Sequence, residues 1–227
     1  MFHPMSAAQM SFATTSDSGR VAHGLEECFA HTDLQWRLGQ IPDSHAVRGV
    51  FMNMLDERAG EFGPQVQQTY RSFFQTYSFA PVRLYPVKDY LTRLVKLAQI
   101  KWGGPDIYRG IFEIQAAAFP AWSRSLPGRV MFAVLGTEFH SVLNAQRRAM
   151  RTCINHGTFE VKNDHRDHYI AEFREQPNYI QHAMTGALTG VARVCNVDVK
   201  LHVDLKDPFN GDIHITVLGP SRPAAAP

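Results

Sequence analysis

The chain has 227 residues, of which 44% are hydrophobic and 19% charged, and its formal net charge is +2. This composition is that of a globular protein with a substantial core, and so small a charge argues against a nucleic-acid-binding domain, which usually carries a strongly basic face. The three cysteines, Cys28, Cys153 and Cys195, are far apart and form no Cys-x-x-Cys pair, which predicts reduced thiols in a cytoplasmic protein.

Both ends of the sequence predict loose segments around one domain. Residues 1–22 are small and polar, without a basic start or an apolar run, so we expect a disordered segment there and no secretory signal. Residues 218–227 are rich in proline and alanine and predict a loose tail. No run of about 18 apolar residues predicts a membrane span. Residues 23–217 are therefore expected to form a single domain.

Helical periodicity dominates the sequence up to about residue 150. Apolar residues recur at spacings of three, four and seven, and capping residues or prolines stand where such runs begin. The pattern predicts helices after an N-cap at Asp43 or Ser44, from Pro64, from Pro86, from residue 107 to a stop before Pro120, and over 129–152.

After residue 150 the period changes to the alternation that is typical of strands. Residues 155–175 predict two strands around a polar turn, 177–194 predict a helix, and 197–205 with 212–217 predict a second hairpin. The fold class is therefore α+β, with a helical N-terminal part packed on a four-stranded antiparallel sheet in β-β-α-β-β order. Gly186 and Gly190, four apart in the intervening helix, would let another backbone approach closely.

Aromatic residues crowd the stretch from Tyr70 to Tyr90. Phe73, Tyr77 and Tyr90 belong to this group, and the sequence leaves two roles open for them. They pack in the core, or they line an apolar pocket between the helices and the sheet, where a small apolar or planar ligand would bind.

The last hairpin offers a candidate metal site. If inward-facing positions pair with each other, His202 lies opposite His214 and Asp204 lies opposite Asp212, with Cβ atoms about 4.5–5.5 Å apart. Two imidazoles and two carboxylates on one face suit zinc or another divalent ion. The alternative is a polar face turned to solvent or to an interface.

Charged segments elsewhere have simpler explanations. Arg147, Arg148 and Arg151 lie in the last turns of the 129–152 helix, where positive charge complements the helix dipole, although they also suit a phosphate or an acidic partner. The histidines of the segment HGTFEVKNDHRDH, which include His156, are expected to be solvated.

Residues 45–217 resemble a known group of proteins. The stretches HAVRGVFMNMLDERAGE, LYPVKDYLTRLVKLA, DIYRGIFEIQA, YIQHAMTGALTGVARVCNVDVKLHV and GDIHITV look like a paralogous family of uncharacterised bacterial proteins known from myxobacteria. That family is distantly similar to the haem nitric-oxide/oxygen-binding domains and to Golgi-tethering domains of the TRAPP type. Helices followed by β-β-α-β-β is the layout of that superfamily. The resemblance implies sensing, ligand capture or protein assembly.

The resemblance also assigns a role to one histidine. Haem-binding relatives carry a proximal histidine on the long helix before the first hairpin and a Tyr-x-Ser-x-Arg motif on a following strand. His140, preceded by Phe139, occupies the corresponding helix, and Tyr169 occupies the strand. However, Ala171 replaces the serine, and Arg174 comes five residues after Tyr169, which in a strand places it on the opposite face. The cofactor is therefore unknown, and haem remains one option beside a purely structural His140.

These observations lead to one functional hypothesis and two alternatives. No metalloprotease, nucleophile-elbow or phosphate-loop motif is present, so we expect no enzyme. We expect a cytoplasmic sensor or adaptor that takes part in signalling and binds a small ligand or a protein partner. The first alternative is a ligand-free scaffold that acts as a homodimer through the Gly186–Gly190 helix or the edge of the last hairpin. The second is a haem- or metal-binding protein that uses His140 or the pair His202 and His214.

Overall fold

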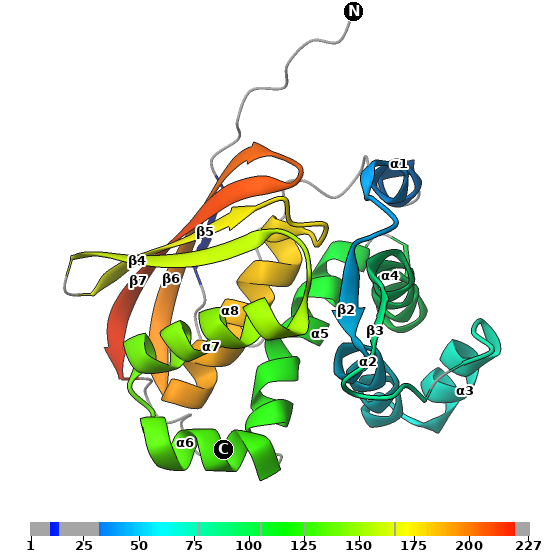
Figure 1. Cartoon of the computed structure of the whole chain (residues 1–227), viewed down its shortest axis with the longest axis horizontal. Helices are drawn as coiled ribbons and strands as arrows, with labels where there is room; N and C mark the ends of the chain where they lie inside the picture. The colour runs from blue at the N-terminus through cyan, green and yellow to red at the C-terminus, as the bar shows by residue number, and fades with distance from the viewer. Residues whose placement is uncertain are drawn as a thin grey trace, which may run out of the picture.

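A five-stranded sheet and a set of helices make up the fold (Figure 1). The computed structural model describes residues 10–13, 32–76, 78–104, 106–124, 126–165 and 167–220. Helices α7 and α8 lie against one face of the sheet, α5 packs on α8, and α1 to α4 form a second group beside them. Among the described residues, no helix is long and apolar enough to cross a membrane.

The helical part precedes the two hairpins, as the periodicity predicts. Its elements are α1 (Thr32–Gln40), β2 (Ala46–Arg48), α2 (Gly49–Glu61), α3 (Pro64–Ser72), β3 (Leu84–Pro86), α4 (Val87–Trp102), α5 (Ile107–Ser123), α6 (Leu126–Leu135) and α7 (Phe139–Cys153). Pro64 is the first residue of α3, as predicted, because a first-turn residue needs no amide hydrogen for the helix, whereas Pro86 ends β3 and is the N-cap of α4. Helix α1 has no counterpart among the predicted helices.

The β-β-α-β-β order is confirmed. It comprises β4 (Thr158–His165), β5 (His168–Arg174), a π-helical turn η1 (Ile180–Met184) that leads into α8 (Thr185–Cys195), β6 (Val197–Asp207) and β7 (Asn210–Pro220). All strand pairs are antiparallel, in the order β1-β6-β7-β5-β4.

The fifth strand corrects the expectation for the N-terminal segment. Within residues 1–22, the stretch β1 (Met10–Ala13) pairs with β6. Strand β7 also continues to Pro220, into the stretch expected to be a loose tail. The other residues of both terminal segments lie outside the described part of the chain.

Two helix boundaries differ from prediction for local reasons. Helix α2 begins at Gly49, because residues 46–48 pair with β3 as a two-stranded ribbon. The expected helix over 129–152 is two helices: Gly136 adopts a left-handed conformation, with φ of 70°, and Glu138 caps the start of α7. His140 therefore lies in the first turn of a helix and not in the middle of a long one.

Helix α5 packs closely against α8. It continues through Pro120, against the expected stop, and Pro120 has no amide hydrogen to donate to the carbonyl of Ala116. Gly190 of α8 lies beside that carbonyl: a Cβ added there would stand 2.7 Å from the Ala116 oxygen. Gly186 meets the Phe112 carbonyl in the same way. The expected close approach of a backbone is real, but α5 of the same chain fills it, so these glycines are not a dimer contact. The outer edge of β6 is likewise paired with β1.

Candidate functional site

The seam between helix α7 and the sheet brings three of the predicted ligand-binding residues together. The ring of His140 stacks on Tyr169, with ring centroids 5.5 Å apart, and Phe139 meets Tyr169 edge-on at 5.7 Å. The Nε2 atom of His140 lies 2.9 Å from the side-chain nitrogen of Asn144, one turn along the helix. Tyr169 is only 6% exposed, so this cluster belongs to the packed interior.

Glu138 fixes the position of His140. Its carboxylate accepts hydrogen bonds from the backbone amides of His140 at 3.0 Å and Ser141 at 2.6 Å. Partial burial would raise the pKa of Glu138, but these hydrogen bonds outweigh burial and hold the pKa below its usual value. The anionic cap at the helix N-terminus therefore orients the first turn that carries Phe139 and His140.

The remaining predicted ligand-binding residues lie in the other helical group. Tyr90 of α4 is buried and accepts a hydrogen bond from Gln115 at 2.6 Å, and its burial raises its pKa to about 12. Phe73 follows α3 and is 54% exposed, with the ammonium of Lys96 lying 4.3 Å from its ring centre. An open cavity of about 520 Å³ adjoins Phe73, between α3 and α4. Tyr77 lies outside the described residues. Of the two alternatives for these aromatics, Tyr90 fits packing in the core, and Phe73 lies neither in the core nor in a pocket between the helices and the sheet.

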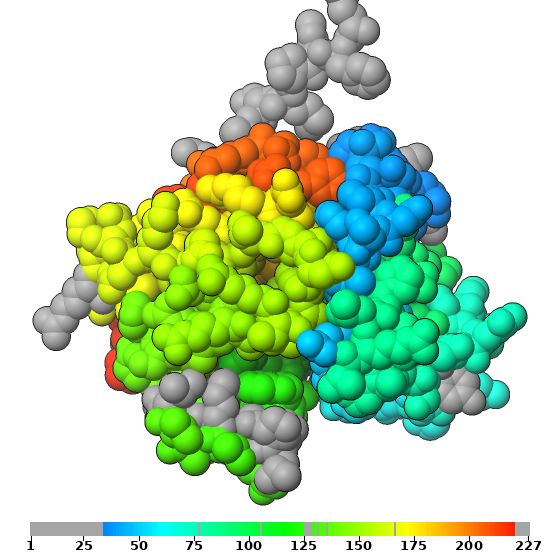
Figure 2. All heavy atoms as spheres, viewed as in Figure 1, coloured from blue at the N-terminus to red at the C-terminus, as the bar shows by residue number. Residues whose placement is uncertain are grey.

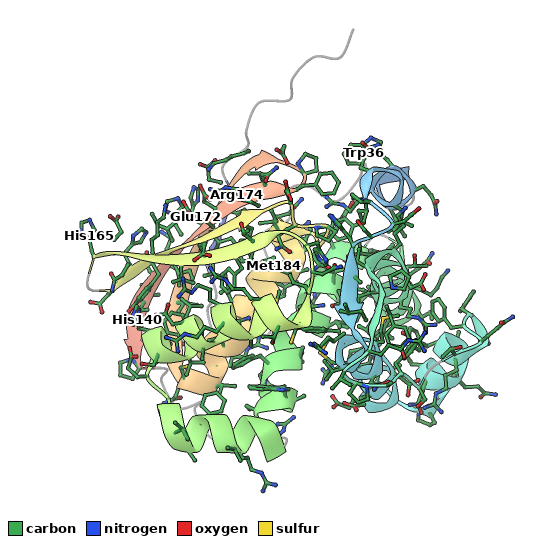
Figure 3. The ribbon with its side chains drawn as sticks, viewed as in Figure 1. Trp36, His140, His165, Glu172, Arg174 and Met184 are labelled. Carbon is green, nitrogen blue, oxygen red and sulfur yellow. The ribbon has the colours of Figure 1, made fainter. Side chains whose placement is uncertain are left out.

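The residues on the inner face of β5 do not fit haem propionates. Tyr169, Ala171 and Phe173 alternate on that face, and the pairing with β4 has no bulge between Tyr169 and Arg174. Phe173 thus occupies the position at which the Tyr-x-Ser-x-Arg motif places its arginine, and it stacks on Phe159 at 4.9 Å. Arg174 lies on the outer face, as predicted, where it binds Asp212 at 2.6 Å. Figure 3 shows Arg174 above the sheet and His140 below it. A haem bound as in that motif would find no arginine side chain to pair with its propionate groups.

A second feature of the seam, here called the clasp, joins residues 44–48 to residues 152–156. The side chain of Asn155 accepts from the Ala46 amide at 2.7 Å and donates to the Ser44 carbonyl at 2.8 Å. Val47 and Ile154 form an isolated β-bridge. Arg48 donates to the Thr152 carbonyl at 2.6 Å. The clasp therefore ties the group of helices α2 to α4 to the α7–β4 connection.

Two histidines lie at the centre of the clasp. The rings of His45 and His156 stack in parallel, with centroids 5.0 Å apart and an interplanar angle of 13°. His156 is 5% exposed, and among the described residues neither of its ring nitrogens has a hydrogen-bond partner of acceptable geometry. Burial, together with the adjacent His45, lowers the pKa of His156 to about 4, against a weaker opposing effect of the Ala46 carbonyl. His156 was expected to be solvated, and its burial depends on His45, which is 111 positions earlier.

A hollow of about 140 Å³ lies directly beside the clasp, between α7 and β4. Figure 2 shows it as a depression between the surfaces of these elements. It is lined by Met150, Arg151, Ile154, Asn155, His156, Gly157, Thr158 and Phe159. Near it, Arg147 and Arg151 both bind Glu160 of β4, which holds the pKa of Glu160 below its usual value. Two of the three clustered arginines thus have a structural partner on β4.

A buried arginine forms a further connection that the sequence does not reveal. Arg37 of α1 is 2% exposed and donates to the carbonyls of Pro177 at 3.1 Å and Pro208 at 3.0 Å. Its guanidinium lies over the rings of Tyr179 and Phe209. These partners are 140 and 171 positions away in the sequence, so no local pattern indicates the contact. The one available signal was an arginine in the middle of α1, a helix that was not predicted.

The predicted register of the last hairpin is confirmed, but one of its two carboxylates is already bound to cations. His202 pairs with His214, and Asp204 pairs with Asp212. Asp212 binds both Arg174 at 2.6 Å and Lys206 at 2.8 Å, and these cations overcome its partial burial and keep its pKa low. In the part of the chain that the structure describes, no group of three His, Cys, Asp or Glu side chains is arranged so that it could hold a metal ion. Asp212 therefore drops out of the predicted metal site.

The comparisons with known proteins agree with this fold. No curated protein matches the sequence. A solved structure titled "Probing the function of heme distortion in the H-NOX family" superposes with a TM-score of 0.60 at 13% identity, covering 79% of this chain and 100% of that one. An H-NOX protein from S. oneidensis in the Fe(II) ligation state gives 0.58 at 11% identity, covering 77% and 98%.

At so low an identity, these neighbours show a shared fold and nothing more. The sequence itself matches a family over residues 41–208, which is most of the chain. The expected resemblance to haem nitric-oxide/oxygen-binding domains is thus confirmed at the level of fold, and the chain belongs to the family described as "Protein of unknown function (DUF2378)".

Proposed function

We propose that this chain is a non-enzymatic, cytoplasmic sensor or adaptor domain that binds a small ligand in the hollow between α7 and β4. One observation carries the proposal: Ile154, Asn155 and His156 line the hollow and also make the clasp. A ligand in the hollow would therefore change the contacts that join the α2–α4 group to the rest of the domain.

The clasp has a physical reason to adopt a second state. A buried polar group without a hydrogen bond costs about 1–3 kcal/mol, and His156 carries two such nitrogens. Opening of the clasp would let water bind these nitrogens, which favours an open form. A ligand that prefers one form shifts the balance by its difference in affinity for the two forms. The surface around the clasp would differ between the two forms, and a protein partner that binds only one form would respond to the ligand.

Size and lining indicate the kind of ligand. A cavity of about 150 Å³ accommodates a single benzene ring, whereas pockets for larger cofactors measure about 300–1,000 Å³. The hollow, at about 140 Å³, suits a compact planar molecule of one ring. Phe159, Met150 and Ile154 offer apolar contacts, and Thr158 and Arg151 offer polar ones. The proposed ligand is therefore smaller than haem.

Ligand retention by the full chain tests the proposal. Native mass spectrometry of the purified protein should detect a bound small molecule, or a panel of one-ring compounds should contain one that raises the melting temperature. Met150→Trp should abolish either effect, because an indole fills the hollow. Val134→Trp adds the same indole to an exposed position on α6 and should leave binding intact. Binding that survives Met150→Trp, or a panel without any ligand, refutes the proposal.

A further inference from the structure

The open cavity between α3 and α4, with a volume of about 520 Å³, has no part in the proposed function. On its α3 side, Val66, Thr69 and Phe73 follow each other at steps of three and four residues. On its α4 side, Lys96 and Ile100 are four residues apart. Such steps bring side chains to one face of a helix, so two helical faces form the walls of the cavity. We call this cavity the α3–α4 groove.

The walls of the groove are largely apolar and include one exposed aromatic ring. Val66 and Ile100 are partly buried and pack against the core. Phe73 is 54% exposed, although Tyr70, three residues earlier, is fully buried. A single exposed apolar side chain needs no explanation, but Phe73 stands beside the apolar wall of a cavity. Aromatic side chains in such positions often supply much of the binding energy of a protein–protein contact. Phe73 is therefore suited to anchor a partner.

Two cations of α4 give the groove a positive charge. The ammonium of Lys96 lies 4.3 Å from the ring centre of Phe73, and the guanidinium of Arg93 lies 4.1 Å from that of Phe74. Among the described residues, neither cation forms an ion pair with a carboxylate. No Asp or Glu of the described chain lines the groove either. The groove is therefore complementary to an apolar surface that carries a carboxylate.

The shape of the groove favours a helix over a small molecule. Small-molecule pockets usually bury 70–90% of their ligand, whereas this groove is open and leaves Phe73 half exposed. Seven residues separate Val66 from Phe73, which is roughly 10 Å along a helix, or about two turns. An amphipathic helix that lies in a groove between two helices uses apolar residues at positions i, i+3 or i+4, and i+7, which cover this length.

We propose that the α3–α4 groove binds an amphipathic helix of a protein partner, whose apolar residues contact Val66, Phe73 and Ile100 and whose acidic residue pairs with Lys96. This goes beyond the ligand site in the hollow, because it gives a surface on which the domain meets its partner. Figure 1 shows α3 on the side of the helical group that is turned away from α7 and β4. The groove and the hollow share no lining residue.

A phage-displayed library of 16-residue peptides, selected on the full chain, tests the groove. Enriched peptides should combine apolar residues at helical spacing with Asp or Glu, and the same peptides, synthesised with a fluorophore, allow affinity to be measured by anisotropy. Phe73→Asp should weaken binding by more than about 10-fold, because it removes the anchor. Val134→Asp is its matched control, since Val134 is 79% exposed on α6, and should leave the affinity unchanged.

Charge reversal tests the ion pair separately. Lys96→Glu should weaken binding several-fold, and a peptide with Lys in place of its acidic residue should recover binding to that variant. This recovery also shows that the variant is folded. Lys101→Glu, on the same helix but outside the lining of the groove, should bind as the parent does.

Three results would overturn the proposal: enrichment of no acidic amphipathic peptide, binding that a folded Phe73→Asp variant retains, or a dimer of this chain that Phe73→Asp dissociates, since a second copy would then occupy the groove. Met150→Trp, which fills the hollow, should not affect peptide binding. The groove and the ligand site in the hollow can therefore fail independently.

Discussion

Acid should weaken the clasp through His156, and replacing this histidine by phenylalanine should remove the effect. In the folded protein the pKa of His156 is about 4, against an ordinary value of 6.5. Above pH 6.5 the ring is neutral in both the folded and the unfolded chain. Between pH 6.5 and about 4 the unfolded chain takes up a proton that the folded chain refuses, so the free energy of unfolding falls as the pH falls.

The structure sets the size of this loss. One pKa unit corresponds to about 1.4 kcal/mol, so a shift from 6.5 to about 4 amounts to about 3 kcal/mol at the acid end, as an upper value for a partly solvated site. The stacked ring of His45 would face the new charge. His182 adds a similar but separate dependence, because burial, and secondarily Arg37, lower its pKa to about 3.

Urea unfolding monitored by circular dichroism, at steps of pH across this window, measures the effect. His156→Phe keeps the stacking area, removes the two unpaired nitrogens and should flatten the pH dependence by up to about 3 kcal/mol relative to the parent. His165→Phe, at an exposed histidine, should keep the parent's slope. If His156→Phe and the parent lose stability equally between pH 6.5 and 4, the assignment of a buried neutral His156 is wrong.

Three other outcomes follow from the packing. Gly190→Ala should lower stability by about 1–3 kcal/mol, because its Cβ would meet the Ala116 carbonyl, whereas Gly39→Ala, with nothing within 4 Å, should raise it by up to about 1 kcal/mol; thermal melting of both decides. Arg37→Met should cost about 2 kcal/mol in urea unfolding, because the Pro177 and Pro208 carbonyls lose their donor, and an unchanged midpoint would contradict this. Protein expressed with excess haem should show no Soret absorption, because Phe173 stands where a propionate would need arginine; a stoichiometric haem band would refute that reasoning.

Sequence reasoning located the hairpins and their register because that information is local. In VDVKLHVDL every second residue is apolar, so the alternation specifies the buried face and the tight turn specifies the pairing. His202 opposite His214 and Arg174 on the face opposite Tyr169 follow from this rule. The positions of Pro64 and Pro86 at helix starts are equally local.

Other features depend on contacts that no local pattern carries. The apolar period continues through residues 129–152, and only the left-handed Gly136 and the cap at Glu138 divide the helix. Phe73 continues the apolar stripe of α3, yet it is 54% exposed and its ring meets the charged end of Lys96 from α4. The spacing pattern reports which residues can face a partner, and it does not report whether a partner is present.

The amino-acid sequence alone determined the α+β class, the order β-β-α-β-β of elements along the chain and the faces of the strands, since periods of 2 and 3.6 residues arise from the backbone of each element. Tertiary structure decided the clasp between His45 and His156, the burial of Arg37, and the arrangement of His168 beside His214. In each case side chains that are distant in sequence meet because separate elements pack together, and burial by those elements then sets their hydrogen bonding and charge.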